Sequence, residues 1–280
     1  MSVNQISALE RTMYNDEFRE DFEREESLLK KCVRSDGLMK AGTVTWDVLS
    51  PSDVAEERTR DGNIPESSLG LSQVTGTPKE QFKKYRIDSF DAYKSNPNVR
   101  SAQNKKGITS CNQAIDQAII DALDTSTNTA GTLALNSFGA VLDWTTTLWE
   151  NDVKPDGKVW GLLTPRAAAQ LMRINEYKSS DFVTVRPAEK GLPAVGYRHW
   201  LDVNWLMHTG LSGKGTATAK VHLFHESAIG HQIAGEPETH AYYYEPQDRW
   251  EAWAKVCHVA KMCLQRGSIT AVHDDTAALV

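Results

Sequence analysis

Strict alternation of apolar and polar side chains marks one short stretch in the first fifth of the chain. Val44, Trp46 and Val48 alternate with two threonines and an aspartate. Because residues two apart share a face of a strand, this stretch predicts a strand with one apolar face, ended by Pro51. Residues 82–90 predict a return strand. The long run between them is rich in Gly, Ser, Pro and charge, so we expect an extended hairpin that reaches away from the body.

A helical pattern precedes this hairpin. Phe18, Phe22 and Leu29 fall on one side of a helix predicted over residues 17–31, among many charged residues. An apolar stripe this thin cannot bury much surface alone. We therefore expect residues 1–34 to form an amphipathic arm that lies against its own domain or against a neighbouring chain.

Three more helices are predicted further along the chain. A polar connector over residues 96–107 precedes the first of them. Their expected positions are from Thr109 or Ser110 to Leu123, over residues 137–150, and from Thr164-Pro165 onward, where the threonine caps the helix and the proline takes its first position. In the second helix we expect Val141, Leu148 and Trp149 to be buried.

Strand-like segments alternate irregularly with these helices. They are predicted over residues 159–163, 197–208 and 220–224. Regular alternation of strands and helices would predict a doubly wound parallel sheet, and this chain has none. The sequence therefore predicts an α+β fold.

The last quarter of the chain reads as a strand, a connection with turn residues, and a closing element that ends at Arg266-Gly267. Within it Trp250, Trp253, Val256, Cys257 and Ala260 keep a helical period, and the type of this element stays open.

Composition places the chain among ordinary globular proteins. Of its 280 residues 40% are hydrophobic and 24% are charged, and the formal net charge is −6. A dedicated nucleic-acid binder usually carries a basic patch on a basic domain, so the acidic balance argues against that class. It is compatible with a protein that surrounds nucleic acid without gripping it.

The cysteines and the N-terminal region indicate a reduced, soluble protein made in the cytoplasm. Cys32, Cys111, Cys257 and Cys263 form no C-x-x-C pair, so buried thiols are expected rather than a zinc site. No stretch has the basic start and apolar run of a secretory signal. No window approaches the roughly 18 apolar residues of a membrane span.

Two motifs suggest chemistry and fail on their spacing. Gly213-Lys214-Gly215-Thr216 lacks both the upstream glycine and the adjacent Ser or Thr of a phosphate-binding loop. His222 and His225, with His231 further on, could be read as the ligands of a metal-dependent hydrolase. On a strand, however, positions three apart point to opposite faces, so the first two imidazoles would not meet one metal ion. We expect no catalytic, cofactor-binding or metal-binding residues.

Aromatic residues gather in the last third of the chain. They could stack bases, but they lack the basic interleaving that single-strand binding needs. We expect core and subunit-contact roles for Trp200, Trp205, Tyr242, Tyr243, Tyr244, Trp250 and Trp253.

The order of parts resembles that of tailed-bacteriophage major capsid proteins of the Hong Kong 97 type. The sequence features that carry this resemblance are Leu-Phe-His-Glu-Ser-Ala-Ile-Gly-His at 223–231, Glu245-Pro-Gln-Asp-Arg-Trp, the ending that starts at Arg266-Gly267, and the helix after Thr164-Pro165. The resemblance implies the Hong Kong 97-like capsid fold. Its parts would be an N-terminal arm (1–34), an extended hairpin or E-loop (35–90), a P-domain with the spine helix (91–130 and 227–262) and an A-domain (131–226 and 263–280).

The resemblance also implies a function and partners. The chain would self-assemble, as hexamers and pentamers, into an icosahedral shell that encloses double-stranded DNA in the virion, after assembly in the host bacterial cytoplasm. Portal and decoration proteins would be partners. No long extension precedes the arm, so a separate scaffolding protein is expected. No membrane is implied.

The residues expected at subunit interfaces are Phe18, Phe22, Val44, Trp46 and Val48. On this hypothesis Trp46→Asp would leave the monomer fold intact and block assembly. Two alternatives remain: an encapsulin-type compartment shell of the same fold, and the histidine-dependent metal hydrolase.

Overall fold

The computed structural model describes residues 24–40, 42–50, 57, 60, 62, 70–88, 98–178 and 198–278. The chain divides into two compact units. The first comprises residues 1–27, 80–115 and 235–257, and the second comprises residues 28–79, 116–234 and 258–280. Helices and strands are mixed without regular alternation, so the predicted α+β class is confirmed.

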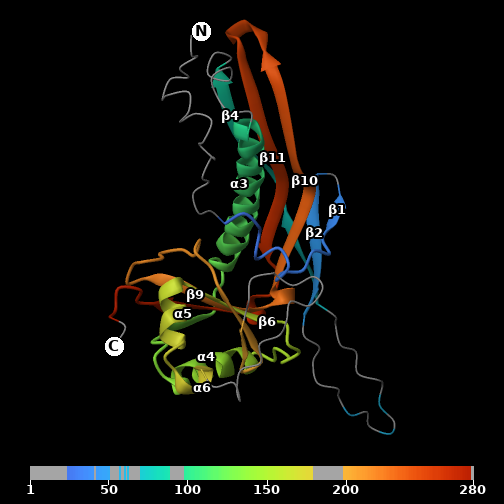
Figure 1. The fold of residues 1–280 in the computed structure, drawn as a ribbon. Coiled ribbons are helices and arrows are strands. Elements are labelled where there is room, and N and C mark those ends of the chain that lie inside the picture. The colour runs from blue at the N-terminus through green and yellow to red at the C-terminus, as the bar shows by residue number, and fades with distance from the viewer. Residues whose placement is uncertain are drawn as a thin grey trace, which may run out of the picture. The chain divides into compact units, whose positions relative to one another are not determined.

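A six-stranded mixed sheet forms the main core of the second unit (Figure 1). Two of its neighbouring pairs are parallel, β12 with β5 and β6 with β8, and the other three are antiparallel. In spatial order the strands are β5 (Thr129–Thr132), β12 (Ser268–His273), β9 (Ala219–His225), β6 (Val159–Leu163), β8 (Val203–Met207) and β7 (Arg198–Trp200). The predicted strands at 159–163 and 220–224 are confirmed. The predicted stretch 197–208 is a hairpin that turns at Leu201 and Asp202, both with positive φ.

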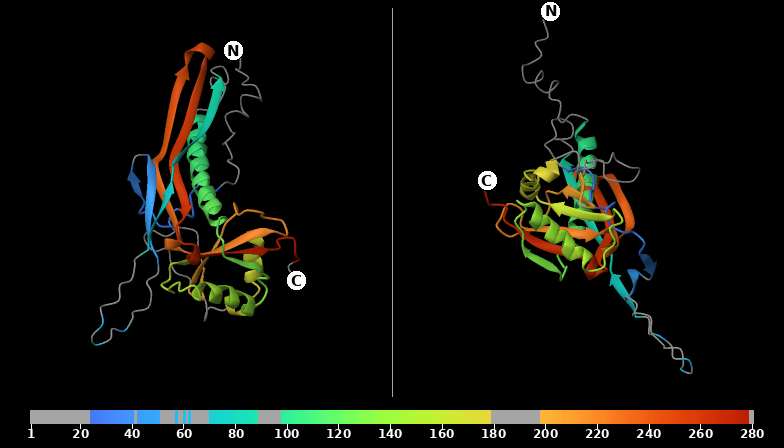
Figure 2. Two further views of the ribbon diagram at one scale, coloured as in Figure 1. Left: turned by 180° about the vertical axis from the view of Figure 1, so that it is seen from behind. Right: turned by 90° about the horizontal axis from the view of Figure 1, so that it is seen from below.

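Two helices of this unit, α4 (Phe138–Trp149) and α5 (Pro165–Leu171), begin where the sequence predicts, and the short α6 (Asn175–Lys178) was not predicted. α4 lies over one face of the sheet (Figure 2, right). Ser137 and Thr164 cap α4 and α5 by accepting hydrogen bonds from the Ala140 and Ala167 backbone N–H groups.

One expected core position of α4 is wrong. Trp144, and not Trp149, is buried, since it lies one turn from Val141 and from Leu148 on the same side of the helix. Its ring packs 5.9 Å from that of Trp205. Val141 and Leu148 are buried as predicted.

A second, three-stranded sheet contains the strand predicted from strict alternation. β2 (Thr43–Leu49) lies between β1 (Leu38–Lys40) and β3 (Leu71–Gly76) and is antiparallel to both. The return strand is therefore β3, inside a stretch expected to be irregular. The predicted return strand at 82–90 corresponds instead to β4 (Lys79–Asp88), which pairs in another sheet. β3 could not be predicted from the hydrophobic pattern, because most of the side chains of β3 are exposed and no apolar face distinguishes the strand from a loop.

The described end of the predicted arm is not helical. Residues 24–34 form turns and a single bridge to Gly230. The N–H groups of Leu28 and Leu29 donate to the carboxylate of Asp116, at 3.3 and 3.2 Å. The helix predicted over 17–31 is thus wrong from residue 24 onward, because a buried side chain binds these amides. Phe18 and Phe22 lie outside the described residues.

The first unit contains a sheet in the order β10-β11-β4 and most of the long helix α3 (Asn98–Leu123). β10 (Ile229–Tyr244) and β11 (Arg249–Met262) join through a short 3-10 turn at Glu245–Gln247. The element whose type was left open is thus a strand. α3 begins well before the predicted cap, because residues 98–107 include the good helix formers Arg, Ala, Gln and Lys although they show no apolar period. None of the helices in the described part is long and apolar enough to span a membrane.

Candidate assembly surfaces

The apolar face of β2 is part of the protomer's own core. Val44 and Trp46 are buried, with 0% and 1% exposure, and pack with Val259 and Cys263, while Val48 is partly buried against this cluster. We call this side of the small sheet the closed face. Contact of its residues with another subunit stays a prediction.

Trp46 occupies a slot that glycine backbones shape. A Cβ at Gly37 would lie 2.8 Å from the indole Nε1, and one at Gly230 would lie 2.5 Å from Cε2. Contacts this close leave no room for a charged, hydrated side chain at position 46. The expectation that Trp46→Asp would leave the monomer fold intact is therefore wrong.

The other side of the same sheet exposes apolar residues. Leu49 pairs directly with Leu71 across the two strands, and their exposed fractions are 59% and 71%. Leu38 on β1 is 53% exposed. Leu49 follows Thr43, Thr45 and Asp47 at intervals of two, so it lies on the polar side of β2. A leucine at such a position is the signal in the sequence that could have indicated an exposed apolar site. Exposed aliphatic pairs of this kind are typical of contact surfaces.

The sheet β10-β11-β4 has one side that α3 covers and one that we call the open face. On the covered side a Cβ at Gly107 of α3 would lie 2.9 Å from that of Ala254 and 4.0 Å from the Tyr85 ring. The open face holds the alternate positions. Its centre is Trp253, whose ring contacts those of Phe82, at 5.9 Å, and His240, at 4.4 Å.

A buried carboxylate ties the three strands of the open face together. Glu251 is 2% exposed, and it pairs with Lys84 and, at 2.6 Å, with Arg249. Arg86 lies 3.6 Å away, and the Tyr242 hydroxyl donates to the same carboxylate. The hydrogen bond from Lys84, followed by that from Tyr242, lowers the pKa of Glu251 to about 2. This cluster was not predicted from the sequence, and the signal that could have indicated it is the period-two spacing of Arg249, Glu251 and Trp253.

The aromatic residues of the last third divide between core and surface. Trp200 and Trp205 are buried in the six-stranded sheet unit, as the core prediction requires. Tyr242, Tyr243 and Tyr244 are 37–42% exposed at the end of the β10–β11 hairpin, where Asp248 adopts a left-handed conformation. These tyrosines are available for subunit contacts, which stay a prediction.

The histidines proposed as metal ligands have different partners. His222 is buried beside Thr270 and lies 3.4 Å from Asp124. His225 contacts Asp156 at 3.2 Å. Within the described ranges no three His, Cys, Asp or Glu side chains come together to hold a metal ion.

His231 belongs to yet another environment. Its ring lies 5.6 Å from that of His258. Burial, with the nearby His258 adding to the effect, lowers the pKa of His231 to about 4. Burial also lowers the pKa of His222 and of His258. These imidazoles are neutral core groups at pH 7.

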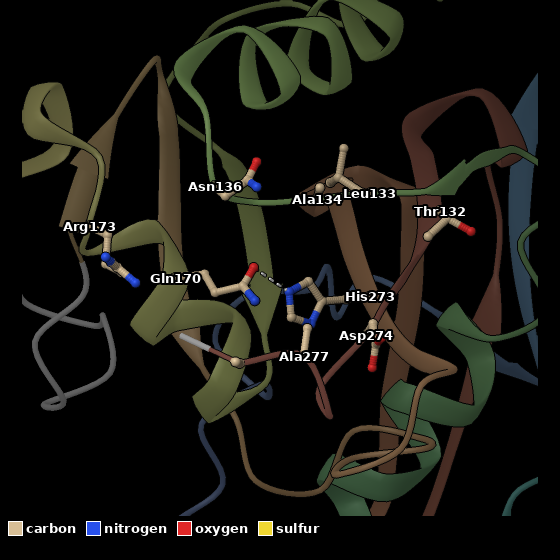
Figure 3. Close-up of a pocket in the computed structure, with 10 residues that line it drawn as sticks. Thr132, Leu133, Ala134, Asn136, Gln170, Arg173, His273, Asp274 and Ala277 are labelled. Carbon is tan, nitrogen blue, oxygen red and sulfur yellow. Dashed lines mark hydrogen bonds between the residues drawn. The ribbon is translucent and has the colours of Figure 1, made fainter. Parts of the chain in front are cut away.

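A cavity of about 510 Å³ opens beside β12 and α5 (Figure 3). His273 on its wall has both ring nitrogens engaged, by Asp275 at 2.8 Å and by Gln170 at 2.9 Å. Asp275 also accepts hydrogen bonds from the Thr164 hydroxyl and the Gly215 N–H. His273 therefore has no free nitrogen to act as a base, and the network ties the last strand to α5 and to the 213–216 loop.

The cysteines are all free thiols, with Cys32, Cys111 and Cys263 buried and Cys257 partly buried. Burial raises the pKa of each thiol. Protonated, enclosed thiols are poor nucleophiles and poor metal ligands, which fits the expectation of structural cysteines.

Comparisons with known proteins agree with this architecture. A family model described as phage capsid protein matches residues 6–260. A structure from Mycobacterium phage Che8 aligns with a TM-score of 0.66 at 13% identity, covering 94% of this chain and 99% of that chain. The capsid structure of the cyanophage P-SCSP1u gives 0.66 at 12% identity, with 97% and 96% covered. A structure from Microbacterium phage Oxtober96 gives 0.66 at 11%, with 96% and 99% covered. No curated protein matches in sequence.

Proposed function

The chain belongs to the phage capsid protein family, and on that premise we propose that it is the major subunit of an icosahedral shell that encloses double-stranded DNA. The Hong Kong 97-like fold expected from the sequence is confirmed by structural similarity over nearly the whole chain. The family assignment favours the virion over the encapsulin-type compartment and over the metal hydrolase.

The observation that carries the proposal is the family match over 255 residues (6–260), together with surfaces that suit repeated contacts. The exposed Leu49–Leu71 pair and the exposed tyrosines of the β10–β11 hairpin lie on extended strands. Many weak contacts of this kind, repeated over a closed lattice, sum to a stable shell.

We assign the parts of the chain to the family's architecture. Residues 1–34 act as the arm and 35–90 as the E-loop. The P-domain comprises 91–130 and 227–262, and the A-domain comprises 131–226 and 263–280. The net charge of −6 suits a wall that encloses DNA without binding it tightly. Hexamers and pentamers assemble in the host cytoplasm with separate scaffolding, portal and decoration proteins.

The test is size-exclusion chromatography with negative-stain electron microscopy. The chain is expressed alone and together with the other structural genes of its phage. Closed shells or capsomer rings in either sample support the proposal, and nuclease-resistant DNA in the resulting virions supports the enclosed genome. A protein that stays monomeric in both samples contradicts it.

A further inference from the structure

A second cavity, of about 530 Å³, lies within the second unit. Its wall combines the end of β2, the loop that follows α4, the 3-10 turn after β9 and the 3-10 turn before β12. The apolar side chains on this wall are Val48, Leu49, Val153 and Leu264. A cavity of this size, with an apolar wall and a few polar groups, is typical of sites for small ligands. The polar groups then determine which chemistry the cavity can support.

Three of the polar lining residues form one chain of hydrogen bonds. The Nδ1 atom of His225 lies 2.7 Å from the hydroxyl oxygen of Ser227. The Nε2 atom of the same ring lies 3.2 and 3.3 Å from the two carboxylate oxygens of Asp156. A hydroxyl, an imidazole and a carboxylate in this order are the groups that activate a serine as a nucleophile. All three line the cavity, so an activated hydroxyl would face the space that a ligand can occupy.

The backbone fixes the tautomer of His225. The Ser227 N–H donates to Nδ1 at 3.2 Å, and a backbone amide can only donate, so Nδ1 carries no proton. The proton of the neutral ring is therefore on Nε2, where it bonds to Asp156, and the Ser227 hydroxyl must donate to Nδ1. The two ring nitrogens exchange the roles that they have in serine proteases, which leaves the order of the proton transfers unchanged.

The charge and exposure of these groups suit a reactive site. Burial alone would raise the pKa of Asp156, but hydrogen bonds from the Lys158 N–H and from His225 lower this pKa overall. The carboxylate is therefore ionised at neutral pH and stabilises a proton on the imidazole. The His225 side chain is 15% exposed, and Ser227 is half-buried, so a ligand in the cavity can reach the hydroxyl.

We propose that Ser227 is the nucleophile of an ester-hydrolysing site in this cavity, with His225 as its general base. Asp156 is a positioning residue, because it acts on the ester only through the imidazole. All three side chains belong to one protomer, so this activity does not depend on formation of the shell.

The lining of the cavity indicates the class of ester. The two cations on the wall, Lys154 and Arg266, offset the two carboxylates, Asp152 and Asp156. The cavity therefore does not select a charged ligand, and its apolar wall favours hydrocarbon. The substrate class that fits is a neutral ester with a short apolar acyl group.

The reaction is an acyl transfer through Ser227. Its oxygen bonds to the carbonyl carbon of the ester while the hydroxyl proton moves to Nδ1 of His225. Protonated Nδ1 can no longer accept from the Ser227 N–H, so this amide becomes available to the oxyanion. The bond to the leaving alcohol then breaks, and the alcohol takes the proton from Nδ1. Water repeats both transfers at the acyl-serine, which releases the acid and restores the hydroxyl.

A fluorophosphonate with a short alkyl chain tests the nucleophile in the full chain. We expect the wild type to lose fluoride from the probe and to carry the phosphonyl group on Ser227, as mapped by mass spectrometry of its peptides. Ser72→Ala is the matched control, because the Ser72 hydroxyl donates to the Val48 carbonyl instead of to an imidazole. This variant should be labelled like the wild type. A serine that only caps the 3-10 turn would not react, so an unlabelled Ser227 would overturn the proposal.

Hydrolysis of p-nitrophenyl butyrate measures turnover. Ser227→Ala and, separately, His225→Gln should lower kcat/KM about a hundredfold, as the loss of a nucleophile or of a general base does. Asp156→Asn should lower kcat with little change in KM, because the amide no longer holds the tautomer in which Nδ1 is free to accept.

Spectra and melting temperatures show whether each variant is folded. A folded Ser227→Ala variant that hydrolyses the ester at the wild-type rate would assign the turnover to other surface groups and would also overturn the proposal. If Ser227→Ala does not fold, the position of the label on the wild type still decides. A label on Ser227 supports the proposal, and a label found only on other residues contradicts it.

Discussion

Two tryptophans, each within a period-two pattern on its own sheet, differ in how far they are buried within the protomer. Trp46 on the closed face is 1% exposed and fills a slot between glycine backbones and Val259. Trp253 on the open face is only partly buried, between Phe82 and His240, beside a carboxylate held by three cations. Both lie in a period-two pattern. The difference shows that alternation identifies an apolar face but does not identify the chain that covers it.

The two faces differ in which of their side chains remain exposed in one protomer. The closed face buries its apolar residues within one protomer, so the hydrophobic effect there stabilises the subunit itself. The open face is held by ion pairs and leaves Arg86, Glu238 and the Phe82 ring exposed, so another subunit can still contact it. Substitutions on the closed face should therefore affect folding first, and those on the open face should affect assembly.

The largest effect is expected from Trp46→Asp. Loss of the buried indole costs about 3–5 kcal/mol, and burial of an unpaired charge adds to this. Phe82→Asp on the open face should cost less, about 1–2 kcal/mol, because it loses one aromatic contact and strand propensity at an exposed position. Urea unfolding of the unassembled chain measures both. Equal losses for the two variants would remove the distinction between the faces.

His231→Phe tests the interior next to the closed face. The folded-state pKa of His231 is about 4 and the ordinary value is 6.5, so the unfolded chain binds more protons between these values. Wild-type stability is therefore full above pH 6.5 and falls by up to about 3 kcal/mol as the pH drops to 4. Lys30, Asp116 and His258 face the same ring.

The variant should lose less stability than the wild type between pH 7 and pH 4.5, as read from urea midpoints at the two pH values. Burial also lowers the pKa of His258, so part of the decline should persist. An unchanged decline would show that His231 is not the group that titrates.

A pair of glycines on one strand gives a finer comparison. A Cβ at Gly230 would lie 2.5 Å from the Trp46 ring, whereas one at Gly235 would lie 3.7 Å from its nearest neighbour, Cys257. We expect Gly230→Ala to cost about 1–3 kcal/mol through overpacking. Gly235→Ala should be neutral or slightly stabilising, because alanine has fewer unfolded conformations. Melting temperatures of the two variants should differ accordingly, and matching values would contradict the tight slot at Trp46.

An effect that depends on both pH and salt is expected from Glu251→Gln. The folded-state pKa of Glu251 is lowered from 4.5 to about 2, so its ionised form stabilises the fold above pH 4.5, and this contribution is lost as the pH falls toward 2. The variant should show a flatter dependence of melting temperature on pH in that window. Because the cations are partly exposed, added salt should reduce the difference at neutral pH. A difference that persists in high salt would contradict this account.

Local patterns predicted much of the fold. Alternation gave β2, capping residues gave the starts of α4 and α5, and the irregular mixture gave the α+β class. Errors arose where distant groups decide local structure. The amides of Leu28 and Leu29 bind Asp116, far away in sequence, instead of continuing a helix. β3 was missed because strand pairing, and not an apolar face, defines it.

The candidate surfaces were harder to predict than the fold. The sequence identified Trp46 as important but could not reveal that Gly37 and Gly230 enclose it. The period-two spacing of Arg249 and Glu251 did not show that Lys84 and Tyr242, on two other strands, also contact Glu251. These contacts depend on the register in which the strands pair. The pattern of residues in a single sequence does not predict that register.

The most direct test of the central contrast is a cryo-electron microscopy structure of the assembled shell at side-chain resolution. The account predicts that Trp46 stays enclosed by its own subunit. It also predicts that Phe82, Arg86 and Trp253 are covered by a neighbouring subunit. A shell in which the open face is bare to solvent, or in which another subunit fills the slot around Trp46, would contradict it.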